Sequence, residues 1–356
     1  MGHQQLQPGQ VFAGYRIERL LGVGGMGAVY LARHPNLPKL VALKLLSRAM
    51  TDDDVRTRFL READHIARLE HPNIVAVYDR GDQDGQLWIA MQYIDGSDAA
   101  AAVSEGPLPA ERAVRIITET AKALDFAHAA DVLHRDVKPA NILLTRPATG
   151  EPERILLADF GIAKALDDRT GITATGMFAG SLQYAAPEQL NASITLDARA
   201  DQYSLGCTLY HLLTGSAPYP GNTAQQWIHG HLFLPAPLPS HSPTAQQTGI
   251  PAGMDAVIQR ALAKDRNHRY PSCAALAAAA QHALGSTAPE ATMAATAGAI
   301  PAYPPGEVPT ELRTQVLPPH QGIPTQRATD TAPPVARSRR KRLIAALVIL
   351  VVAAAG

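Results

Sequence analysis

The stretch that decides the fold reads His134-Arg135-Asp136-Val137-Lys138-Pro139-Ala140-Asn141, and Asp159-Phe160-Gly161 follows it after an apolar run. Asp136 supplies a carboxylate that can orient an attacking hydroxyl, and Lys138 supplies a cation beside it. Asn141 and Asp159 carry the hard oxygen atoms that Mg²⁺ prefers as ligands. Phosphoryl transfer asks for these groups and for little covalent chemistry, so the stretch predicts a site for that reaction.

The order and spacing of these residues resemble the catalytic loop and the DFG motif of a protein kinase. A further segment, Gln183-Tyr184-Ala185-Ala186-Pro187-Glu188-Gln189, adds to the likeness. Over about residues 15–284 the chain resembles the membrane-anchored, eukaryotic-like Ser/Thr protein kinases of bacteria, most of all the actinobacterial ones. The resemblance implies an α+β, bilobal protein-kinase fold. The expected parts of the chain are an N-terminal arm at 1–14, a small, mainly β N-lobe at 15–94 and a larger, mainly α C-lobe at 95–284.

The resemblance also implies a role for each residue of the motif. Asp136 is expected to accept the proton of a Ser or Thr hydroxyl on a protein substrate, and Lys138 to stabilise the transferring phosphoryl group. Asn141 and Asp159 would hold Mg²⁺, or Mn²⁺ in its place, against the phosphates of ATP. A lysine two places after the catalytic aspartate resembles the Ser/Thr branch of the family rather than the tyrosine kinases. The expected activity is that of an ATP-dependent Ser/Thr protein kinase.

A glycine-rich segment near the N-terminus predicts the part of the site that covers the nucleotide. Glycines let the backbone approach phosphates closely, but a lone GxGxxG pattern also marks a dinucleotide-binding turn. Here a β-branched and aromatic strand follows the glycines instead of a helix, which favours the kinase form. The nucleotide-binding residues expected in this segment are Leu21, Gly22, Val23, Gly24, Gly25, Met26, Gly27, Ala28 and Val29.

One lysine lies inside the apolar run 41–46, where a charge is costly unless it is paired. By resemblance, Lys44 would bind the α- and β-phosphates, and Glu62 would hold it in an ion pair as a further catalytic residue. Glu62 lies on a helix predicted over 53–69. The other nucleotide contacts implied by the resemblance are Ala42, the gatekeeper Met91, the hinge residues Gln92 and Ile94, and Leu143.

Apolar periodicity predicts the surrounding elements. Strand-like runs cover 74–78 and 87–93, with a polar turn at 82–85 between them. An amphipathic helix is expected over 110–129, and His128 near its end is predicted to be helix-terminal rather than catalytic. Short strands are expected at 142–144 and 155–157.

The resemblance adds three scaffold residues in the C-lobe. Asp201 would accept hydrogen bonds from the backbone of the catalytic loop. Glu188 and Arg269 would form a buried ion pair. These side chains are expected to support the site without taking part in the chemistry.

The segment 162–185 loses periodicity and gains Thr, Gly and Asp. By resemblance it is the activation segment, in which Thr173 and Thr175 stand where bacterial members carry paired autophosphorylated threonines. A phosphothreonine there could be ordered by Arg135. Ser181 stands where the family usually has threonine, and it keeps the hydroxyl that contacts the catalytic residues.

Composition narrows the remaining function classes. The formal net charge is +0 at pH 7, so the overall charge of the chain gives no indication of a nucleic-acid partner. Cys207 and Cys273 lie in apolar surroundings without a disulfide framework or metal-ligand spacing, and are predicted to be small core residues. His229 and His231 have no motif context, and metal binding there is disfavoured. Residues 1–20 lack the pattern of a secretory signal peptide, so the catalytic part is expected in the cytoplasm.

The C-terminal part changes character after Leu284. Residues 285–336 are rich in Ala, Pro, Thr and Gly, and are predicted to be a disordered linker. Its threonines, among them Thr310, Thr314, Thr325 and Thr329, are candidate autophosphorylation sites that would recruit phosphothreonine-binding proteins.

A basic cluster at 337–342 precedes an apolar run at 343–356, which is the pattern of a transmembrane helix with its cytoplasmic flank. The run is shorter than the roughly 20 residues that a spanning helix needs. Either the sequence is truncated inside this helix, or the run is a short tail anchor. The expected location is the cell membrane, single-pass, with a cytoplasmic kinase domain in transmembrane signalling.

Two other functions stay open at this point. One is a catalytically silent, membrane-tethered pseudokinase or scaffold, against which the intact Lys44, Asp136, Asn141 and Asp159 argue. The other is an ATP hydrolase or small-molecule kinase of the same fold. The Ala186-Pro187-Glu188 segment favours protein substrates instead. A homodimer through the small lobe is also left open.

Overall fold

The computed structural model describes residues 5–24, 27–46, 53–147, 152–161, 179–191 and 193–285, all within one compact unit, Met1–Met293. Several predictions fall outside the described residues. These are Gly25 and Met26 of the glycine-rich segment, Thr173 and Thr175, the linker from residue 286 onwards, the basic cluster at 337–342 and the apolar run at 343–356. Among the helices that are described, none combines the length and the apolar character needed to cross a bilayer.

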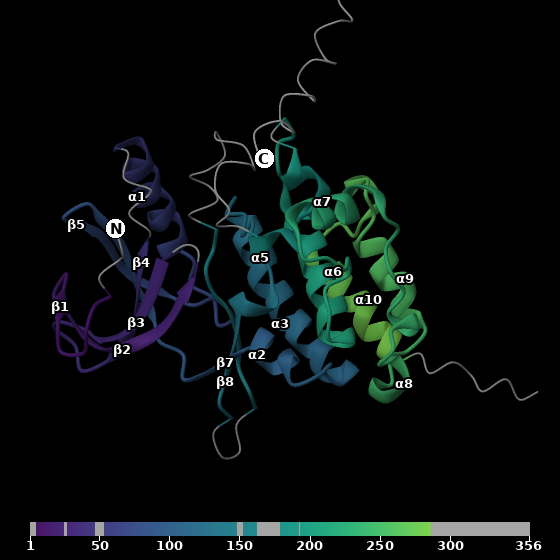
Figure 1. Ribbon diagram of the computed structural model, residues 1–356, viewed down its shortest axis with the longest axis horizontal. Coiled ribbons are helices and arrows are strands. Elements are labelled where there is room, and N and C mark those ends of the chain that lie inside the picture. The colour runs from purple at the N-terminus through teal and green to yellow at the C-terminus, as the bar shows by residue number, and fades with distance from the viewer. Residues whose placement is uncertain are drawn as a thin grey trace, which may run out of the picture. The chain divides into compact units, whose positions relative to one another are not determined.

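The N-lobe is built on a six-stranded antiparallel sheet with the strand order β1-β2-β3-β4-β6-β5 (Figure 1). The strands are β1 (Val11–Phe12), β2 (Tyr15–Gly24), β3 (Gly27–Arg33), β4 (Leu40–Leu46), β5 (Val77–Gln83) and β6 (Gln86–Gln92). The sheet buries a shared apolar core that includes Tyr15, Ile17, Tyr30, Leu43 and Trp88. Burial of such large side chains is what stabilises a small sheet of this kind.

Helix α1 (Asp53–Ala67) packs against β5. Phe59, Ala63 and Ile66 recur at helical spacing and are buried, so they form the stripe that faces the core. The predicted helix over 53–69 is therefore confirmed, although it ends at Ala67. A further backbone hydrogen bond, from Leu69 N to Ile66 O at 2.9 Å, closes the turn that follows.

The strand predicted over 74–78 is wrong in its position. Strand β5 begins at Val77 and continues to Gln83, so the turn to β6 is shorter than expected. Asp84 and Gly85 make that turn with φ values of 53° and 74°. The apolar residues before β5 are used elsewhere: Ile74 forms a parallel bridge with Leu157 of β9. Apolar periodicity alone cannot tell an edge strand from a segment that packs on another lobe.

The C-lobe is mainly helical. Its helices are α2 (Ala99–Ser104), α3 (Ala110–Ala129), α5 (Ala179–Leu182), α6 (Ala198–Thr214), α7 (Ala224–Phe233), α8 (Ala245–Thr248), α9 (Gly253–Ala261) and α10 (Cys273–Gly285). Short 3-10 turns are η1 (Pro139–Asn141), η3 (Pro187–Leu190), η4 (Pro239–His241) and η5 (Arg266–His268). A small antiparallel sheet joins β7 (Gly96–Asp98), β8 (Ile142–Thr145) and β9 (Ile155–Leu157). The helix predicted over 110–129 and the two short strands are confirmed.

Helix α6 is the centre of the C-lobe. Almost all of its side chains are buried, and α3, α9 and α10 pack around it (Figure 1). Its start is capped by Asp197, which accepts a hydrogen bond from Arg199 N at 2.9 Å. It ends at Thr214 and is capped by Gly215, which has φ 79° in the left-handed conformation that favours glycine. A helix buried all round gives a rigid support to the loops that cross it.

Candidate active site

A buried carboxylate of α6 holds the catalytic loop. Asp201 is 1% exposed and accepts hydrogen bonds from the backbone N–H of His134 at 2.8 Å and of Arg135 at 2.7 Å. Arg135 has φ 63°, a conformation that a non-glycine residue keeps only when its surroundings hold it. The two hydrogen bonds supply that restraint one residue before Asp136. The predicted scaffold role of Asp201 is confirmed.

The carboxylate of Asp136 is buried, and two donors converge on its Oδ2 atom. Lys138 Nζ lies 2.8 Å from this oxygen, and Asn141 Nδ2 lies 3.1 Å from it. Asn141 Nδ2 also donates to the Asp136 carbonyl oxygen at 2.8 Å. Lys138 Nζ donates in addition to Ser181 Oγ at 3.0 Å, so the predicted contact between the serine hydroxyl and Lys138 is confirmed. The four side chains fix one another in place.

His134 joins the catalytic loop to the DFG motif. Its Nε2 lies 3.0 Å from the Ala158 carbonyl oxygen, and its ring lies 4.6 Å from the ring of Phe160. The backbone of Gly161 donates to the His134 carbonyl oxygen at 2.8 Å. Burial lowers the pKa of His134, so the ring is neutral and Nε2–H donates to the carbonyl. Nδ1 is then the acceptor for the backbone N–H of Asp136 at 3.2 Å.

The predicted ion pair between Lys44 and Glu62 is not formed in this structure. Lys44 Nζ instead lies 2.8 Å from Asp159 Oδ1, while the carboxylate of Glu62 lies 3.5 Å from Arg61. The Lys44 side chain is only 13% exposed and needs a counterion, whereas that of Glu62 is 30% exposed and can stay in water. The lysine therefore takes the carboxylate that lies within reach, which is that of the DFG aspartate.

Ion pairs also join α1 to β5. Arg56 pairs with Asp82 at 3.3 Å, and Asp64 pairs with Arg80. Arg80 also donates to the Leu60 carbonyl oxygen at 3.4 Å. These contacts span the helix from its first turns to its last, and in this arrangement Glu62 pairs with Arg61 and Lys44 pairs with Asp159.

The two predicted metal ligands offer oxygen atoms suited to Mg²⁺. Asn141 uses its amide nitrogen on Asp136, so its carbonyl oxygen is the atom left for a cation. Asp159 binds Lys44 through Oδ1 and keeps a second carboxylate oxygen, and its side chain is 34% exposed. Its backbone lies in the left-handed region with φ 59°. Hard oxygen donors of this kind fit magnesium better than a softer metal.

The residues expected around the adenine come from both lobes, and several of them come together. Met91, Ile94 and Leu143 pack on one apolar cluster with Val75, Leu156 and Ala158. Ala42 pairs with Met91 across β4 and β6, and Val29 pairs with Lys44 across β3 and β4. Gln92 follows on β6, and its backbone N–H donates to the Ala76 carbonyl oxygen at 2.8 Å.

The glycine-rich segment forms the end of the hairpin between β2 and β3. Leu21, Gly22, Val23 and Gly24 lie on β2, and Gly27, Ala28 and Val29 lie on β3. Gly27 has φ 136°, and a Cβ atom there would collide with the Leu45 carbonyl. Only glycine fits this position, because the backbone of Leu45 on β4 leaves no room for a side chain.

The predicted ion pair between Glu188 and Arg269 is confirmed. The two guanidinium nitrogens lie 2.6 and 2.9 Å from the two carboxylate oxygens, in a bidentate pair that is buried. Arg269 also donates to the carbonyl oxygens of Ala263, Arg199 and Lys264. A desolvated charge pair of this kind is stable only because every donor has a partner.

Two supporting residues were not singled out from the sequence. Gln189 Nε2 donates to the Arg135 carbonyl oxygen at 2.9 Å, so it holds the catalytic loop in addition to Asp201. Asn73 Nδ2 donates to the Ile155 carbonyl oxygen at 2.8 Å and lies 3.1 Å from Glu119 Oε2, which ties the N-lobe to β9 and α3. The only signal for Gln189 was its place at the end of the 183–189 segment.

Two minor predictions concern cysteines and histidines. Both Cys207 and Cys273 are buried, as predicted, and burial raises the pKa of the Cys207 thiol. His231 is buried between α7 and α6, where its Nδ1 lies 2.9 Å from the Tyr203 hydroxyl. Burial lowers the pKa of His231 to about 4, so it is a neutral core residue.

This site geometry agrees with comparisons to known proteins. The family model described as "Protein kinase domain" matches residues 15–282. The chain belongs to the protein kinase family. Among curated proteins, it is 53% identical over 80% of its length to the serine/threonine-protein kinase PknJ of Mycobacterium tuberculosis and 49% identical over 79% to PknF of the same species. Similarity to these proteins places it with the actinobacterial, eukaryotic-like Ser/Thr kinases.

Solved structures agree with this assignment. The kinase domain of PknI of M. tuberculosis is 42% identical with a TM-score of 0.64, over 79% of this chain and 100% of that one. The alignments take in 47% of PknJ and 58% of PknF, so the chain spans about half the length of the curated relatives it matches.

Proposed function

We propose that this chain is a Ser/Thr protein kinase that transfers the γ-phosphate of ATP to Ser and Thr hydroxyls of proteins. The observation that carries the proposal is the cluster of Asp136, Lys138, Asn141 and Ser181. In it, a buried carboxylate and an ammonium group lie 2.8 Å apart, and both have further partners. A scaffold that only binds partners has no use for such an arrangement, so the cluster favours catalysis over the pseudokinase alternative.

In this proposal Asp136 orients the acceptor hydroxyl and takes its proton as the new O–P bond forms. Lys138 compensates the negative charge that develops on the transferred phosphoryl group. The ammonium group is already held by Asp136 and by Ser181, so little reorganisation is needed at the moment of transfer. Asn141 keeps the Asp136 carboxylate in this orientation through its amide nitrogen.

Nucleotide binding would use the groups at the lobe interface. Bound Mg²⁺ would neutralise charge on the phosphates, and Asn141 and Asp159 are the residues suited to hold it. Lys44 would bind the α- and β-phosphates. Because Lys44 pairs with Asp159 in this structure, we infer that binding of ATP draws the two apart and brings Glu62 to the lysine. Val29, Ala42, Met91 and Leu143 would surround the adenine.

Regulation and location follow the same proposal. Phosphorylation of Thr173 or Thr175 would add a charge that Arg135 can bind, and would order the activation segment. The apolar run at 343–356, with its basic flank, would anchor the protein in the cell membrane with the kinase in the cytoplasm. Phosphorylated linker threonines would recruit phosphothreonine-binding proteins, and a homodimer would let one copy phosphorylate another.

The test is an intact-mass measurement of the full chain incubated with ATP and Mg²⁺, beside an Asp136→Asn control of nearly identical shape. The proposal expects mass gained in steps of one phosphate by the wild type alone, mapped to Thr173 or Thr175. A generic protein substrate in the same reaction should also gain phosphate. If neither protein gains mass while nucleotide still binds, the chain is a scaffold. If ATP is only hydrolysed, the protein-kinase proposal fails.

A further inference from the structure

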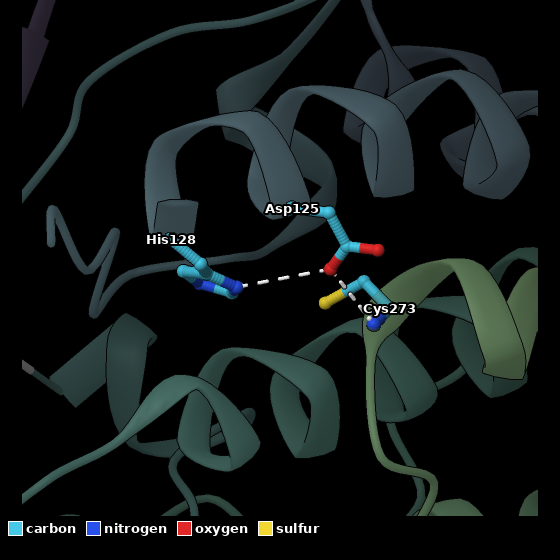
Figure 2. Close-up of side chains that lie close together, drawn as sticks. All are labelled: Asp125, His128 and Cys273. Atoms are coloured by element: carbon cyan, nitrogen blue, oxygen red, sulfur yellow. Dashed lines mark hydrogen bonds and ion pairs between the residues drawn. The ribbon is translucent and has the colours of Figure 1, made fainter. Parts of the chain in front are cut away.

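A cluster outside the active site joins α3 to α10. The side chains of Asp125, His128 and Cys273 face one another at the end of α3 and the start of α10 (Figure 2), and their ligand-type atoms all lie within 4.8 Å. The spacing resembles a metal site, but the atoms are already engaged. Asp125 Oδ1 accepts the backbone N–H of Cys273 at 3.0 Å, and Oδ2 accepts that of Ala274 at 2.9 Å. Burial raises the pKa of the Cys273 thiol, which disfavours the thiolate that a metal would need.

The cluster is therefore better understood as a helix cap with a histidine attached to it. The first backbone N–H groups of a helix have no partner inside the helix, and Asp125 satisfies two of them from a different element. His128 Nδ1 lies 3.8 Å from Asp125 Oδ1, and the dashed lines in Figure 2 mark this contact and the bond to Cys273. The cap and the histidine thus share one carboxylate.

The other side of His128 reaches the catalytic loop. His128 Nε2 lies 2.8 Å from Asp201 Oδ2, the oxygen that also accepts the backbone N–H of His134. Asp201 Oδ1 accepts the N–H of Arg135, whose backbone is in the left-handed region. Three side chains therefore connect the start of α10 to the residue before Asp136.

Charge explains why the connection acts as one unit. Burial alone would lower the pKa of His128, but its hydrogen bond to Asp201 and its ion-pair contact with Asp125, together with the negative charges of both carboxylates, raise it to about 9. The group that faces it from α10 is the neutral thiol of Cys273, and the neighbouring His134 of the catalytic loop is neutral because burial lowers its pKa. At neutral pH His128 is therefore an imidazolium between two carboxylates. Loss of the negative charge of one carboxylate would lower the pKa of His128 and so weaken its interaction with the other carboxylate.

We propose that Asp125 is a positioning residue for the catalytic loop. It acts through His128 and Asp201, and it makes the geometry around Asp136 depend on the docking of α10. The proposal rests on the proposed kinase function for its effect on rate. The link between Asp125 and His128 can be tested without any activity.

The test compares Asp125→Asn with Ser272→Ala in the full chain. Ser272 is the matched control because its Oγ accepts the backbone N–H of Ala275 at 3.1 Å, so its loss weakens the same end of α10 without touching His128. We expect Asp125→Asn to lower kcat by roughly tenfold, the size expected when one charge-assisted contact is lost, with little change in the KM for ATP. Its alkaline pH limit should move to lower pH. Ser272→Ala should keep the wild-type kcat and pH profile.

A second readout follows the His128 imidazole directly by NMR titration. In the wild type it should titrate near pH 9, and in Asp125→Asn it should titrate at lower pH. A double variant with His128→Gln should be no slower than His128→Gln alone, because both changes break the same connection. This second pair keeps the test informative if one variant is unstable.

The outcomes separate the two proposals. Equal losses of kcat in Asp125→Asn and Ser272→Ala would show that only the stability of α10 matters, and the positioning role would be wrong. An unchanged rate and an unchanged His128 titration in Asp125→Asn would also overturn it. If the wild type itself transfers no phosphate, the kinase proposal fails, while the shifted His128 titration would still establish the connection.

Discussion

Lys44 Nζ and Asp159 Oδ1 lie 2.8 Å apart, so the lysine of the N-lobe sheet and the aspartate of the DFG motif form an ion pair between the two lobes. Each of these groups is expected to meet a charged partner during catalysis, the lysine a phosphate and the aspartate a metal ion. Their pairing satisfies both charges within the protein. It also leaves Glu62 paired with Arg61 on α1.

The first prediction concerns Glu62. Because its side chain is partly exposed and does not contact Lys44, Glu62→Gln should change the free energy of unfolding by less than about 0.5 kcal/mol. The same variant should lower kcat strongly if the Lys44–Glu62 pair forms when ATP binds. Urea unfolding and phosphoryl-transfer assays measure the two effects separately. A large loss of stability with normal activity would contradict both parts.

The second prediction concerns Ser181. Its hydroxyl accepts a hydrogen bond from Lys138 at 3.0 Å, so Ser181→Ala would leave the ammonium group with one fewer partner. We expect kcat to fall by roughly tenfold, which corresponds to about 1.4 kcal/mol in the activation barrier. Ser181→Thr is the matched control because it keeps the hydroxyl and should keep the rate. Equal rates for the alanine variant and the wild type would show that Lys138 is held without Ser181.

The third prediction concerns Arg269. Its guanidinium makes a buried, bidentate pair with Glu188, and Arg269→Ala would leave that carboxylate buried without its partner. Such a change costs about 3–5 kcal/mol, enough to unfold much of a marginal domain. The exposed pair of Arg33 with Glu18 is the control, because Arg33→Ala should cost no more than about 1 kcal/mol. Denaturant midpoints of the two variants check the difference.

The fourth prediction concerns the pH dependence of stability through His128. Its pKa is raised from 6.5 to about 9 in the folded protein, so its contribution is fully present below pH 6.5 and is lost as the pH rises through 9. The rise corresponds to about 3 kcal/mol. His128→Gln should therefore lose stability at pH 6.5 and differ little from the wild type above pH 9. Urea unfolding at both pH values measures the difference, and a constant difference would contradict the assigned charge.

The fifth prediction concerns His231, whose lowered pKa should make the folded state less stable at acid pH. Burial lowers its pKa from 6.5 to about 4, so between these pH values the unfolded chain binds a proton that the folded chain does not bind. Stability is then lost as the pH falls from 6.5 towards 4. His231→Asn should weaken the folded state at neutral pH but flatten this acid limb. An acid limb that stays as steep in the variant would assign the effect to other groups.

The local parts of this protein could be predicted from the sequence. The residues of the catalytic loop lie within eight positions of one another, so the sequence places Asp136, Lys138 and Asn141 close together, although Asp201 and Gln189 from other elements hold the loop. The helix over 110–129 follows from a strong apolar period. The pairing of Glu188 with Arg269 and the contact of Asp201 with the loop were implied by resemblance, and the structure confirms them.

The tertiary structure decided the rest, because it depends on how separate elements meet. Whether Lys44 pairs with Glu62 or with Asp159 depends on the position of α1, which packs against β5 and is joined to it by ion pairs. Strand β5 begins later than predicted because Ile74 instead forms a bridge with β9 in the C-lobe. The sequence places His128 at the end of a helix and nothing more. Its charge exists only because Asp125 and Asp201 approach it in a buried space, where a carboxylate must find a cation.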